Sequence, residues 1–352
     1  MNLSVLASLE DENSNLSDFS EQSNYFTSIG LLAEDLNFST IFLFKNSTNK
    51  KNLVSDPLLL QAGLAPIAKR LRLGVGFAPL SFLDPITLAE TCATLDVMSQ
   101  GRLTIAVDEG ARLRTHASIN LNALPIDRQH KENRELLRTA LRGERFNAGS
   151  ANRRATNLQI SVRPLQFPHP PIFAAIYDKD SAAEAGASGF QIFLAPLAAL
   201  RSKDDVATIV GAYRAAQSAA GFSPDPDDII AFCISVAAPD HQHAVEKGRS
   251  AFGRHALVRP NWICRNFDEA MDHDYFLVGG PTVLARKMRA MRDVGVNHLA
   301  LMPTFGGLGA EQSMMTMRVM ADVAAENFGA AAGVSLPMTA DATGAKTCRR
   351  CI

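Results

Sequence analysis

The sequence predicts an α/β protein that closes into a (β/α)8 TIM barrel. Short runs rich in Val, Ile, Leu and Phe alternate with longer segments of helical period, which is typical of buried parallel strands and their connecting helices. Eight such repeats follow one another, and no glycine-rich turn marks the switch point of an open doubly wound sheet. The 352 residues are enough for one barrel of about 250 residues with insertions.

The first half of the predicted barrel begins with three short strand–helix units. Its four strands are expected at residues 3–7, 40–44, 72–77 and 103–107. Pro57 and Pro85 begin the helices that follow the second and third strands, because a proline in the first helical turn loses no hydrogen bond.

The helix after the fourth strand has clear ends and a basic face. Asp127 is expected to cap its start, and Gly143 is expected to end it. Arg134, Arg138 and Arg142 recur at four-residue spacing, which predicts a solvated helix face.

The second half repeats the same alternation up to residue 328. Its strands are expected at residues 171–176, 190–194, 229–237 and 297–301. Its helices are expected at residues 180–187, from 240 onward, at 280–291 and at 310–328.

Two segments break the pattern, and a third lies beyond it. Residues 145–170 and 257–276 are interpreted as insertions after strand 4 and strand 7. Residues 1–328 are expected to form a single domain, and residues 329–352, which have no periodicity, are expected to be a flexible tail. Cys348 and Cys351 form a CxxC motif in this tail, and the sequence assigns it no role.

Composition limits the classes of partner and compartment. The 35 basic and 36 acidic side chains leave a net charge of −1, which disfavours a nucleic-acid partner. Five cysteines do not form a dense disulfide framework. The first nine residues carry no positive side chain, and the uncharged stretch 185–200 is too short for a membrane span. We therefore expect a cytoplasmic protein with no membrane partner.

Three separated groups of motifs carry a family resemblance. The first is 70–76 (RLRLGVG) with 95–103 (LDVMSQGRL), and the second is 168–175 (PHPPIFAA) with 180–182 (DSA). The third is 279–282 (GGPT), 293–298 (DVGVNH) and 305–308 (FGGL). Their order and spacing resemble the bacterial luciferase-like flavin-dependent monooxygenase family, over about residues 30–328.

The resemblance implies a pocket at the C-terminal ends of the strands that binds FMN or the deazaflavin F420. It implies that reduced FMN arrives from a separate flavin reductase, and that O2 supplies oxygen to a small or medium organic substrate. It also implies either a homodimer or a heterodimer with a luciferase-like paralogue.

Four residues match cofactor-binding positions of the family. Ser181 falls where relatives place a hydroxyl on the flavin phosphate, at a helix start that suits an anion, although it could equally be an N-cap. Asp180 matches a position that is often acidic. Gly76 and Phe77 fall where relatives can carry a cis peptide against the flavin, although Gly76 could be an ordinary strand-end glycine.

Three positions depart from the family pattern. Residues 45–47 read Lys-Asn-Ser where the family has Glu-His-His, and Asp108-Glu109 precedes a glycine where an arginine is common. Asp84 replaces a histidine before proline. Carboxylates near a phosphate would repel it, unless Lys45, Arg112 or Arg114 compensates.

Two classes of function follow from these departures. In the first, the protein is an enzyme, with Asn46, Asp108 and Glu109 in the catalytic pocket and the carboxylates serving as acid or base. In the second, it is a non-catalytic luciferase-β-like subunit that has lost its flavin site, binds no cofactor and stabilises a catalytic paralogue. A third reading keeps the enzyme but uses F420 for hydride transfer. His241 and His243 have no further partners at ligand spacing, so no metal is predicted.

Overall fold

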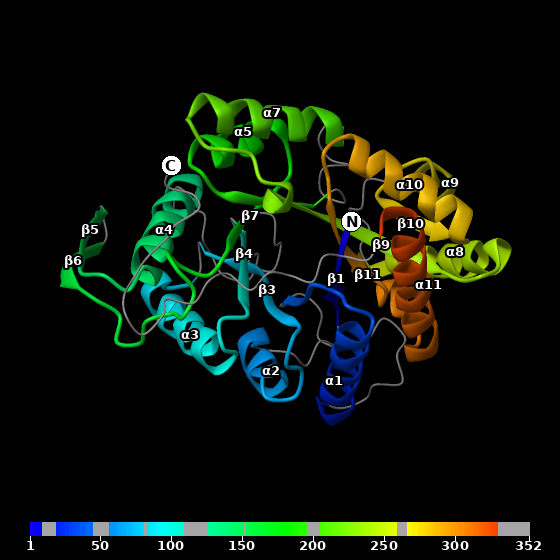
Figure 1. The fold of residues 1–352 in the computed structure, drawn as a ribbon, viewed down its shortest axis with the longest axis horizontal. Helices are drawn as coiled ribbons and strands as arrows, with labels where there is room; N and C mark the ends of the chain where they lie inside the picture. Colours follow the sequence, from blue (N-terminus) through cyan, green and yellow to red (C-terminus); the bar gives the residue numbers. More distant parts are fainter. Residues whose placement is uncertain are drawn as a thin grey trace.

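Eight parallel strands form the centre of the molecule. The computed structural model describes residues 1–8, 19–44, 56–80, 83–108, 126–150, 153–195, 205–258 and 266–329. The barrel strands are β1 (Asn2–Ala7), β2 (Thr40–Phe44), β3 (Arg72–Pro79), β4 (Leu103–Asp108), β7 (Ile172–Ile176), β8 (Gln191–Leu194), β9 (Ile229–Ala237) and β11 (His298–Met302). They pair side by side in this order, and β11 pairs with β1 to close the ring (Figure 1).

The predicted TIM barrel is therefore confirmed. All eight predicted strands are present, and their ends differ from the prediction by at most two residues. The agreement is close because each strand is buried on both faces, which leaves an almost continuous apolar run in the sequence.

Helices surround the barrel on its outside (Figure 1). They are α1 (Phe19–Asp35), α2 (Pro57–Leu64), α3 (Pro85–Met98), α4 (Ile126–Leu141), α5 (Lys179–Ala187), α7 (Val206–Ala219), α8 (His241–Val258), α9 (Phe267–Met271), α10 (Pro281–Asp293) and α11 (Ala310–Phe328), with short 3-10 turns at Pro226–Asp228 and Phe305–Gly307. Pro57 and Pro85 occupy the first turns of α2 and α3, as predicted.

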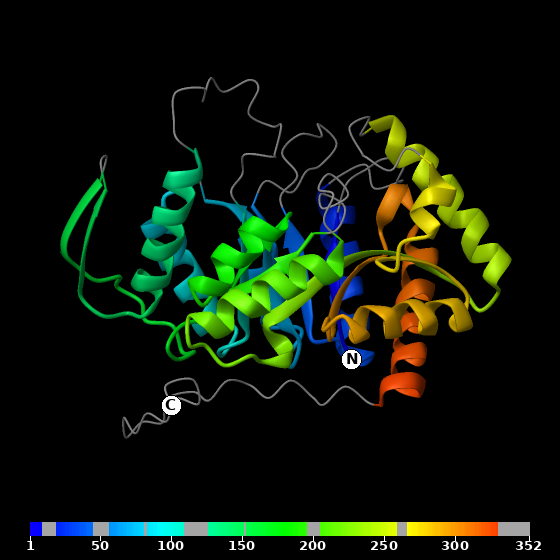
Figure 2. The same ribbon diagram turned by 90° about the horizontal axis from the view of Figure 1, so that it is seen from above.

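The two predicted insertions contain regular structure. Residues 145–170 include an antiparallel hairpin of β5 (Phe146–Ser150) and β6 (Arg153–Leu158), which projects away from the barrel in Figures 1 and 2. Residues 257–276 include α9, and β10 (Phe276–Gly279) begins at their end. β10 pairs in parallel with the last four residues of β9, from Ile234 to Ala237. Residues 330–352, including Cys348 and Cys351, lie outside the described residues.

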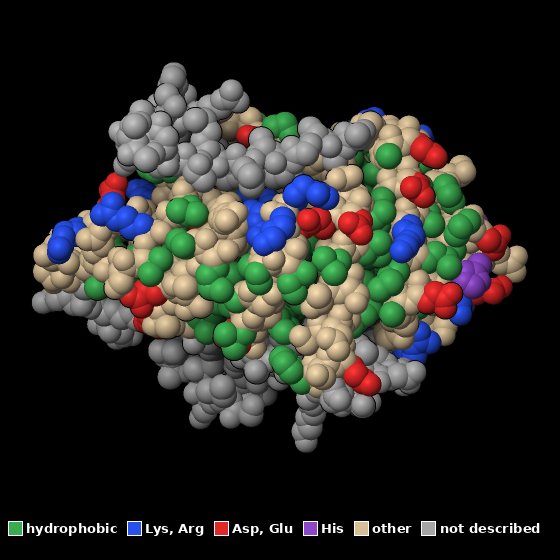
Figure 3. Space-filling view, turned by 60° about the horizontal axis from the view of Figure 1, so that its bottom comes forward, with side chains coloured by type: hydrophobic (Ala, Val, Ile, Leu, Met, Phe, Trp, Pro, Cys, Tyr) green, Lys and Arg blue, Asp and Glu red, His purple; other side chains and the backbone are tan. Residues whose placement is uncertain are grey.

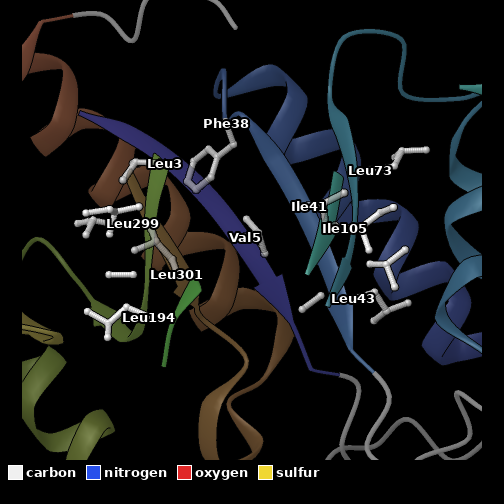
Figure 4. Close-up of a cluster of buried hydrophobic side chains, with 14 of the residues drawn as sticks. Leu3, Val5, Phe38, Ile41, Leu43, Leu73, Ile105, Leu194, Leu299 and Leu301 are labelled. Atoms are coloured by element: carbon white, nitrogen blue, oxygen red, sulfur yellow. The ribbon is translucent and has the colours of Figure 1, made fainter. Parts of the chain in front are cut away.

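The main apolar core lies between the barrel and its helices. Side chains such as Val5, Ile41 and Leu301 point outward from their strands and pack beneath the helices (Figure 4). A second cluster fills the inside of the barrel, where Leu6 and Phe42 occupy the alternate, inward positions.

One glycine allows a large aromatic side chain inside the barrel. Gly74 of β3 lies opposite Phe42 of β2, and a Cβ atom at position 74 would overlap the Phe42 ring. Phe42 is fully buried. The Phe42 ring therefore occupies the space that a side chain at position 74 would need.

The motif at residues 95–103 has a structural role. Arg102 is buried, and its guanidinium donates to the carbonyls of Ser99, Ala68, Leu71 and Ala65, which joins α3 to the end of α2. The Asp96 carboxylate accepts the backbone N–H groups of residues 103, 165 and 166. These bonds satisfy buried polar groups at the N-terminal end of the barrel, so this motif identifies the fold and not the chemistry.

A buried pair also lies at this N-terminal end. Ser4 Oγ and His298 Nε2 are 2.6 Å apart and join β1 to β11. Burial, followed by the positive charge of the amino terminus, lowers the pKa of His298 to about 3. His298 is therefore neutral in the folded protein at neutral pH. Among the described helices, none combines the length and the apolar character that crossing a bilayer requires.

Candidate functional site

The C-terminal ends of the barrel strands bring the candidate site residues together. Gly76 and Phe77 lie near the end of β3, and Asp108 is the last residue of the neighbouring β4. Ser181 follows β7, which is the next strand in the ring, and Asp180 precedes it on the same helix. This end of a TIM barrel is where active sites are built. Asn46 and Glu109 lie outside the described residues.

Phe77 has a strained backbone at this edge. The pairing of β3 with β4 shifts its register between Val75 and Ala78, and Phe77 within this irregularity has a φ of +52°. A bulky residue rarely adopts this conformation, which costs on the order of 1–3 kcal/mol. The peptide bond between Gly76 and Phe77 is not cis, so the unusual geometry falls on the aromatic residue and not on the glycine.

The Phe77 ring is the last of three aromatic rings that contact one another edge to face inside the barrel; we call these three rings the aromatic stack. The Phe77 centroid lies 4.9 Å from that of Phe193 on β8, with the rings edge to face. The Phe193 centroid in turn lies 5.1 Å from that of Phe42, again edge to face. Phe77 is only partly buried, whereas the other two rings are buried. The stack therefore ends in a partly open aromatic surface at the barrel edge, which suits a planar, apolar ligand.

Asp108 places a carboxylate at the same edge. It is only 2 % exposed, and it lies two residues after Ala106, which belongs to the interior cluster. Because side chains alternate along a strand, Asp108 faces the inside of the barrel. A carboxylate held there can accept a hydrogen bond from a bound molecule or transfer a proton to it.

The start of α5 is capped by Asp178, which was not among the predicted site residues. The Asp178 carboxylate accepts the Ser181 backbone N–H at 2.9 Å and lies 2.7 Å from the Ser181 hydroxyl oxygen. The alternative in which Ser181 is the N-cap is therefore wrong, because Ser181 lies three residues inside the cap. The aspartate at this spacing before the helix was the available signal.

An ion pair joins α5 to α4 one turn further along. Arg134 donates two N–H groups to the Glu184 carboxylate at 2.7 and 2.9 Å, and its side chain is only 4 % exposed. The guanidinium carbons of Arg134 and Arg138 each lie 4.3 Å from the centre of the Phe190 ring. The predicted solvated face is therefore wrong for Arg134, which is buried between two helices.

His130 is a buried titratable residue that was not among the predicted site residues. It lies one turn before Arg134 on α4 and is 3 % exposed. Burial, followed by the positive charge of Arg134, lowers the pKa of His130 to about 4. A single histidine in a highly charged helix gave no sequence signal for this burial.

The departure at Asp84 has a structural explanation. Its carboxylate accepts the backbone N–H groups of Ile86 and Thr87 at 3.0 and 2.9 Å and caps α3. On the opposite side of the ring, the Gly280 N–H donates to Nδ1 of His241 at 3.2 Å. Asp84 and His241 therefore each have a hydrogen-bond partner that gives them a structural role.

The described residues fit the ring of a flavin better than its phosphate. The partly open aromatic surface of Phe77 suits the ring system. At the start of α5, however, the Asp178 carboxylate already binds the N–H and the hydroxyl of Ser181, and Asp180 adds a second negative charge. Two like charges 4 Å apart repel by on the order of 4 kcal/mol at an effective dielectric of 20. Lys45, Arg112 and Arg114 lie outside the described residues.

Comparison with known proteins identifies the family. The family model described as luciferase-like monooxygenase matches residues 1–298, and the chain belongs to this family. The chain is 25% identical over 277 residues to the uncharacterized protein y4wF of Sinorhizobium fredii, a match covering 74% of this chain and 79% of that protein. It is 29% identical over 147 residues to the oxygenase component of the flavin-dependent trigonelline monooxygenase of Acinetobacter baylyi, covering 41% of each.

Solved structures share the whole barrel. Monooxygenase RslO1 from Streptomyces bottropensis matches with a TM-score of 0.79 and 25% identity, over 92% of this chain and 98% of that one. The oxygenating constituent of 3,6-diketocamphane monooxygenase from Pseudomonas putida, solved with FMN, has a TM-score of 0.71 and 15% identity over the same shares. An F420-dependent secondary alcohol dehydrogenase has a TM-score of 0.68 and 14% identity, again over these shares. The last two matches support the fold alone.

Proposed function

We propose that this chain is the oxygenase component of a two-component flavin-dependent monooxygenase. It would receive reduced flavin, with FMN as the expected form, from a separate flavin reductase and use O2 to oxygenate a small or medium organic substrate. Besides the family match, the proposal rests on one structural observation. Phe77, Asp108 and the start of α5 lie at the ends of three neighbouring strands, where a single ligand can contact all of them.

Each described residue has a distinct part in this proposal. The flavin supplies the redox chemistry with O2 when it is bound. Phe77 presents its ring to the flavin ring and orients it, while the aromatic stack beneath excludes water from that side. Asp108 holds or moves a proton on the substrate from its place inside the barrel edge. Asn46 and Glu109 keep their proposed places in the pocket on the basis of the resemblance.

The enzyme is favoured over a non-catalytic subunit. A chain that had lost its flavin site would not need to maintain a strained aromatic residue at the barrel edge, since that strain costs stability. One relative is also named as an oxygenase component. F420-dependent hydride transfer is the second candidate activity, motivated by the F420-dependent enzyme that shares the fold.

A test of the flavin chemistry does not require the substrate. Photoreduced FMN is mixed with O2 in a stopped-flow instrument, with and without a molar excess of the protein, and its reoxidation is followed by absorbance. We expect the protein to slow reoxidation, because a bound flavin is shielded from solvent. A rate equal to that of free flavin would exclude the proposed activity. Saturable binding of F420 together with an unchanged FMN reoxidation rate would favour the second candidate.

The substrate search then uses isotope labelling. The protein, an unrelated flavin reductase and NADH are incubated under 18O2 with a panel of small organic compounds. The panel includes trigonelline, because a relative is named for that compound. We expect a labelled product that requires both proteins and that falls sharply with the Asp108→Asn variant.

We also propose that the protein forms a homodimer through the outer faces of α2 and α3. No charged residue occurs between Pro57 and Ala68, and the side chains of Leu59, Ile67 and Met98 are 72%, 48% and 53% exposed. Figure 3 looks onto the face of α1, α2 and α3, where hydrophobic side chains lie across the centre. Exposed apolar side chains that gather on one face are typical of subunit interfaces.

Light scattering after size exclusion tests this interface. We expect a dimer for the protein and a monomer for the double variant Leu59→Glu, Ile67→Glu, while Val162→Glu, at another partly exposed apolar position, stays dimeric. A monomeric starting protein that pairs only with a co-expressed paralogue would support the heterodimer instead.

A further inference from the structure

We infer that this chain selects its flavin by the ring and not by the phosphate, so that riboflavin binds at least as tightly as FMN. Asp178 is the specificity-determining residue. The inference deepens the proposed function and rests on it, because it assumes that a flavin occupies the barrel edge. It follows from the negative charge at the start of α5, which would repel the phosphate of a phosphate-bearing cofactor.

The two donors of Ser181 at the start of α5 are already engaged. The first turn of a helix offers free backbone N–H groups that bind phosphate well. Here one Asp178 carboxylate oxygen lies 2.9 Å from the Ser181 nitrogen and 2.7 Å from the Ser181 hydroxyl oxygen. The Ser181 hydroxyl also lies 3.0 Å from the Asp178 carbonyl oxygen. A phosphate could use these donors only by displacing the carboxylate.

The charge balance around this helix start is also unfavourable for a dianion. Asp178 and Asp180 carry two negative charges in the first turn, against one positive charge on Lys179. Arg134, one turn further along, is bound by both oxygens of Glu184 and packs on the Phe190 ring. The Glu184 carboxylate therefore balances the charge of this guanidinium.

A flavin without a phosphate complements the carboxylates at the start of α5, whereas FMN does not. The ribityl chain of riboflavin ends in a hydroxyl group, which can donate a hydrogen bond to a carboxylate. The phosphate of FMN replaces that donor with negatively charged acceptors. Asp178 and Asp180 therefore favour the hydroxyl end of riboflavin and disfavour the phosphate end of FMN, while Phe77 makes the same contact with either ring.

The chain offers a matched pair of substitutions. Asp178→Asn removes the charge and keeps a side chain that can cap a helix. Asp205→Asn makes the same change at α7, where Asp205 caps the helix by accepting the Thr208 N–H at 2.7 Å. Both variants alter one N-cap, but only the first alters the charge next to Ser181.

The experiment measures the binding of both reduced flavins. Photoreduced riboflavin or FMN is equilibrated anaerobically with the full-length protein, and the free flavin is separated by ultrafiltration and quantified after air oxidation. The NaCl concentration is varied from about 20 to about 200 mM, because salt screens charge repulsion. We expect the Kd of FMN to equal or exceed that of riboflavin, and to fall as salt rises.

The variants give the second part of the result. Asp178→Asn is expected to tighten FMN binding about tenfold and to leave riboflavin binding within about twofold, whereas Asp205→Asn changes neither. FMN binding at least tenfold tighter than riboflavin in the unaltered protein would overturn the inference and leave the proposed function standing. An FMN affinity that Asp178→Asn does not change would overturn the role of Asp178. Absence of binding by both flavins would overturn the proposed function together with this inference.

Discussion

The two oxygens of Glu184 receive two N–H groups of Arg134, at 2.7 and 2.9 Å, and thereby join α5 to α4. Burial raises the pKa of Glu184, but the charge and hydrogen bonds of Arg134 outweigh it, so the pKa lies below its ordinary value. The pair is therefore charged at neutral pH and is mostly removed from solvent.

Arg134→Ala should destabilise the protein by about 3 kcal/mol, because it leaves a partly buried carboxylate without its partner. Urea unfolding at pH 7 measures this change. A double-mutant cycle with Glu184→Gln should give a coupling of about 1–3 kcal/mol. Additive effects of the two substitutions would show that the contact contributes nothing specific. Arg138→Ala is the comparison, because Arg138 contacts the same ring but pairs with the more exposed Glu135.

Gly74→Ala should lower the free energy of unfolding by about 1–3 kcal/mol, because the added methyl group meets the Phe42 ring inside a filled barrel. Gly211→Ala is the matched control. Gly211 lies within α7, and a Cβ atom there would meet no other atom within 4 Å, so this change should stabilise the protein by about 0.5–1 kcal/mol. Equal effects of the two substitutions on urea unfolding would contradict the packing argument.

The stability of the protein should fall as the pH decreases from about 6.5. His298 and His130 have folded-state pKa values of about 3 and about 4, below the ordinary value of 6.5. On acidification the unfolded chain therefore takes up these protons first, and each histidine lowers stability by about 1.4 kcal/mol per pH unit within its window. Above pH 6.5 neither histidine contributes to the slope.

Urea unfolding at pH 7, 6 and 5 measures this slope. His298→Gln and His130→Gln should each make the slope shallower, even where the starting stability is lower. His243→Gln, at an exposed position on α8, should leave the slope unchanged. A slope that survives both buried substitutions would assign the acid sensitivity to other groups.

Two substitutions at Phe77 separate the roles of its ring and its backbone. Phe77→Ala and Phe77→Gly both remove the ring and should weaken the retention of reduced flavin about tenfold. Only glycine adopts a positive φ without strain, so Phe77→Gly should be about 1 kcal/mol more stable than Phe77→Ala. Anaerobic flavin binding and urea unfolding give the two readouts. The reverse order of stability would show that the left-handed backbone is not maintained.

The sequence predicted the strands well because their burial leaves a direct pattern of apolar residues. It did not predict β10, because the four residues from Phe276 to Gly279 are too few to distinguish from the end of an irregular segment. The hairpin of β5 and β6 was missed for a different reason. It lies away from the barrel, and its residues are mostly polar.

The candidate site was predicted only in part, because a motif gives the position of a residue but not its hydrogen-bond partner. The resemblance placed Ser181 at the start of a helix, as observed, but not the Asp178 carboxylate that binds its hydroxyl. Spacing likewise placed Arg134 on a helix face without indicating that Glu184, 50 residues later, would bury it. Both contacts depend on elements that meet only in the folded chain.

The pairing of β1 with β11 has a consequence for folding during synthesis. Residues 2–5 hydrogen-bond with residues 298–301, so the ring stays open until nearly the whole barrel has left the ribosome. Until then β1 has one unpaired edge, and it exposes apolar side chains, such as Val5 and Leu6, that are buried in the folded protein. We therefore expect truncation before residue 298, which leaves that edge open, to yield aggregates and not a smaller folded unit.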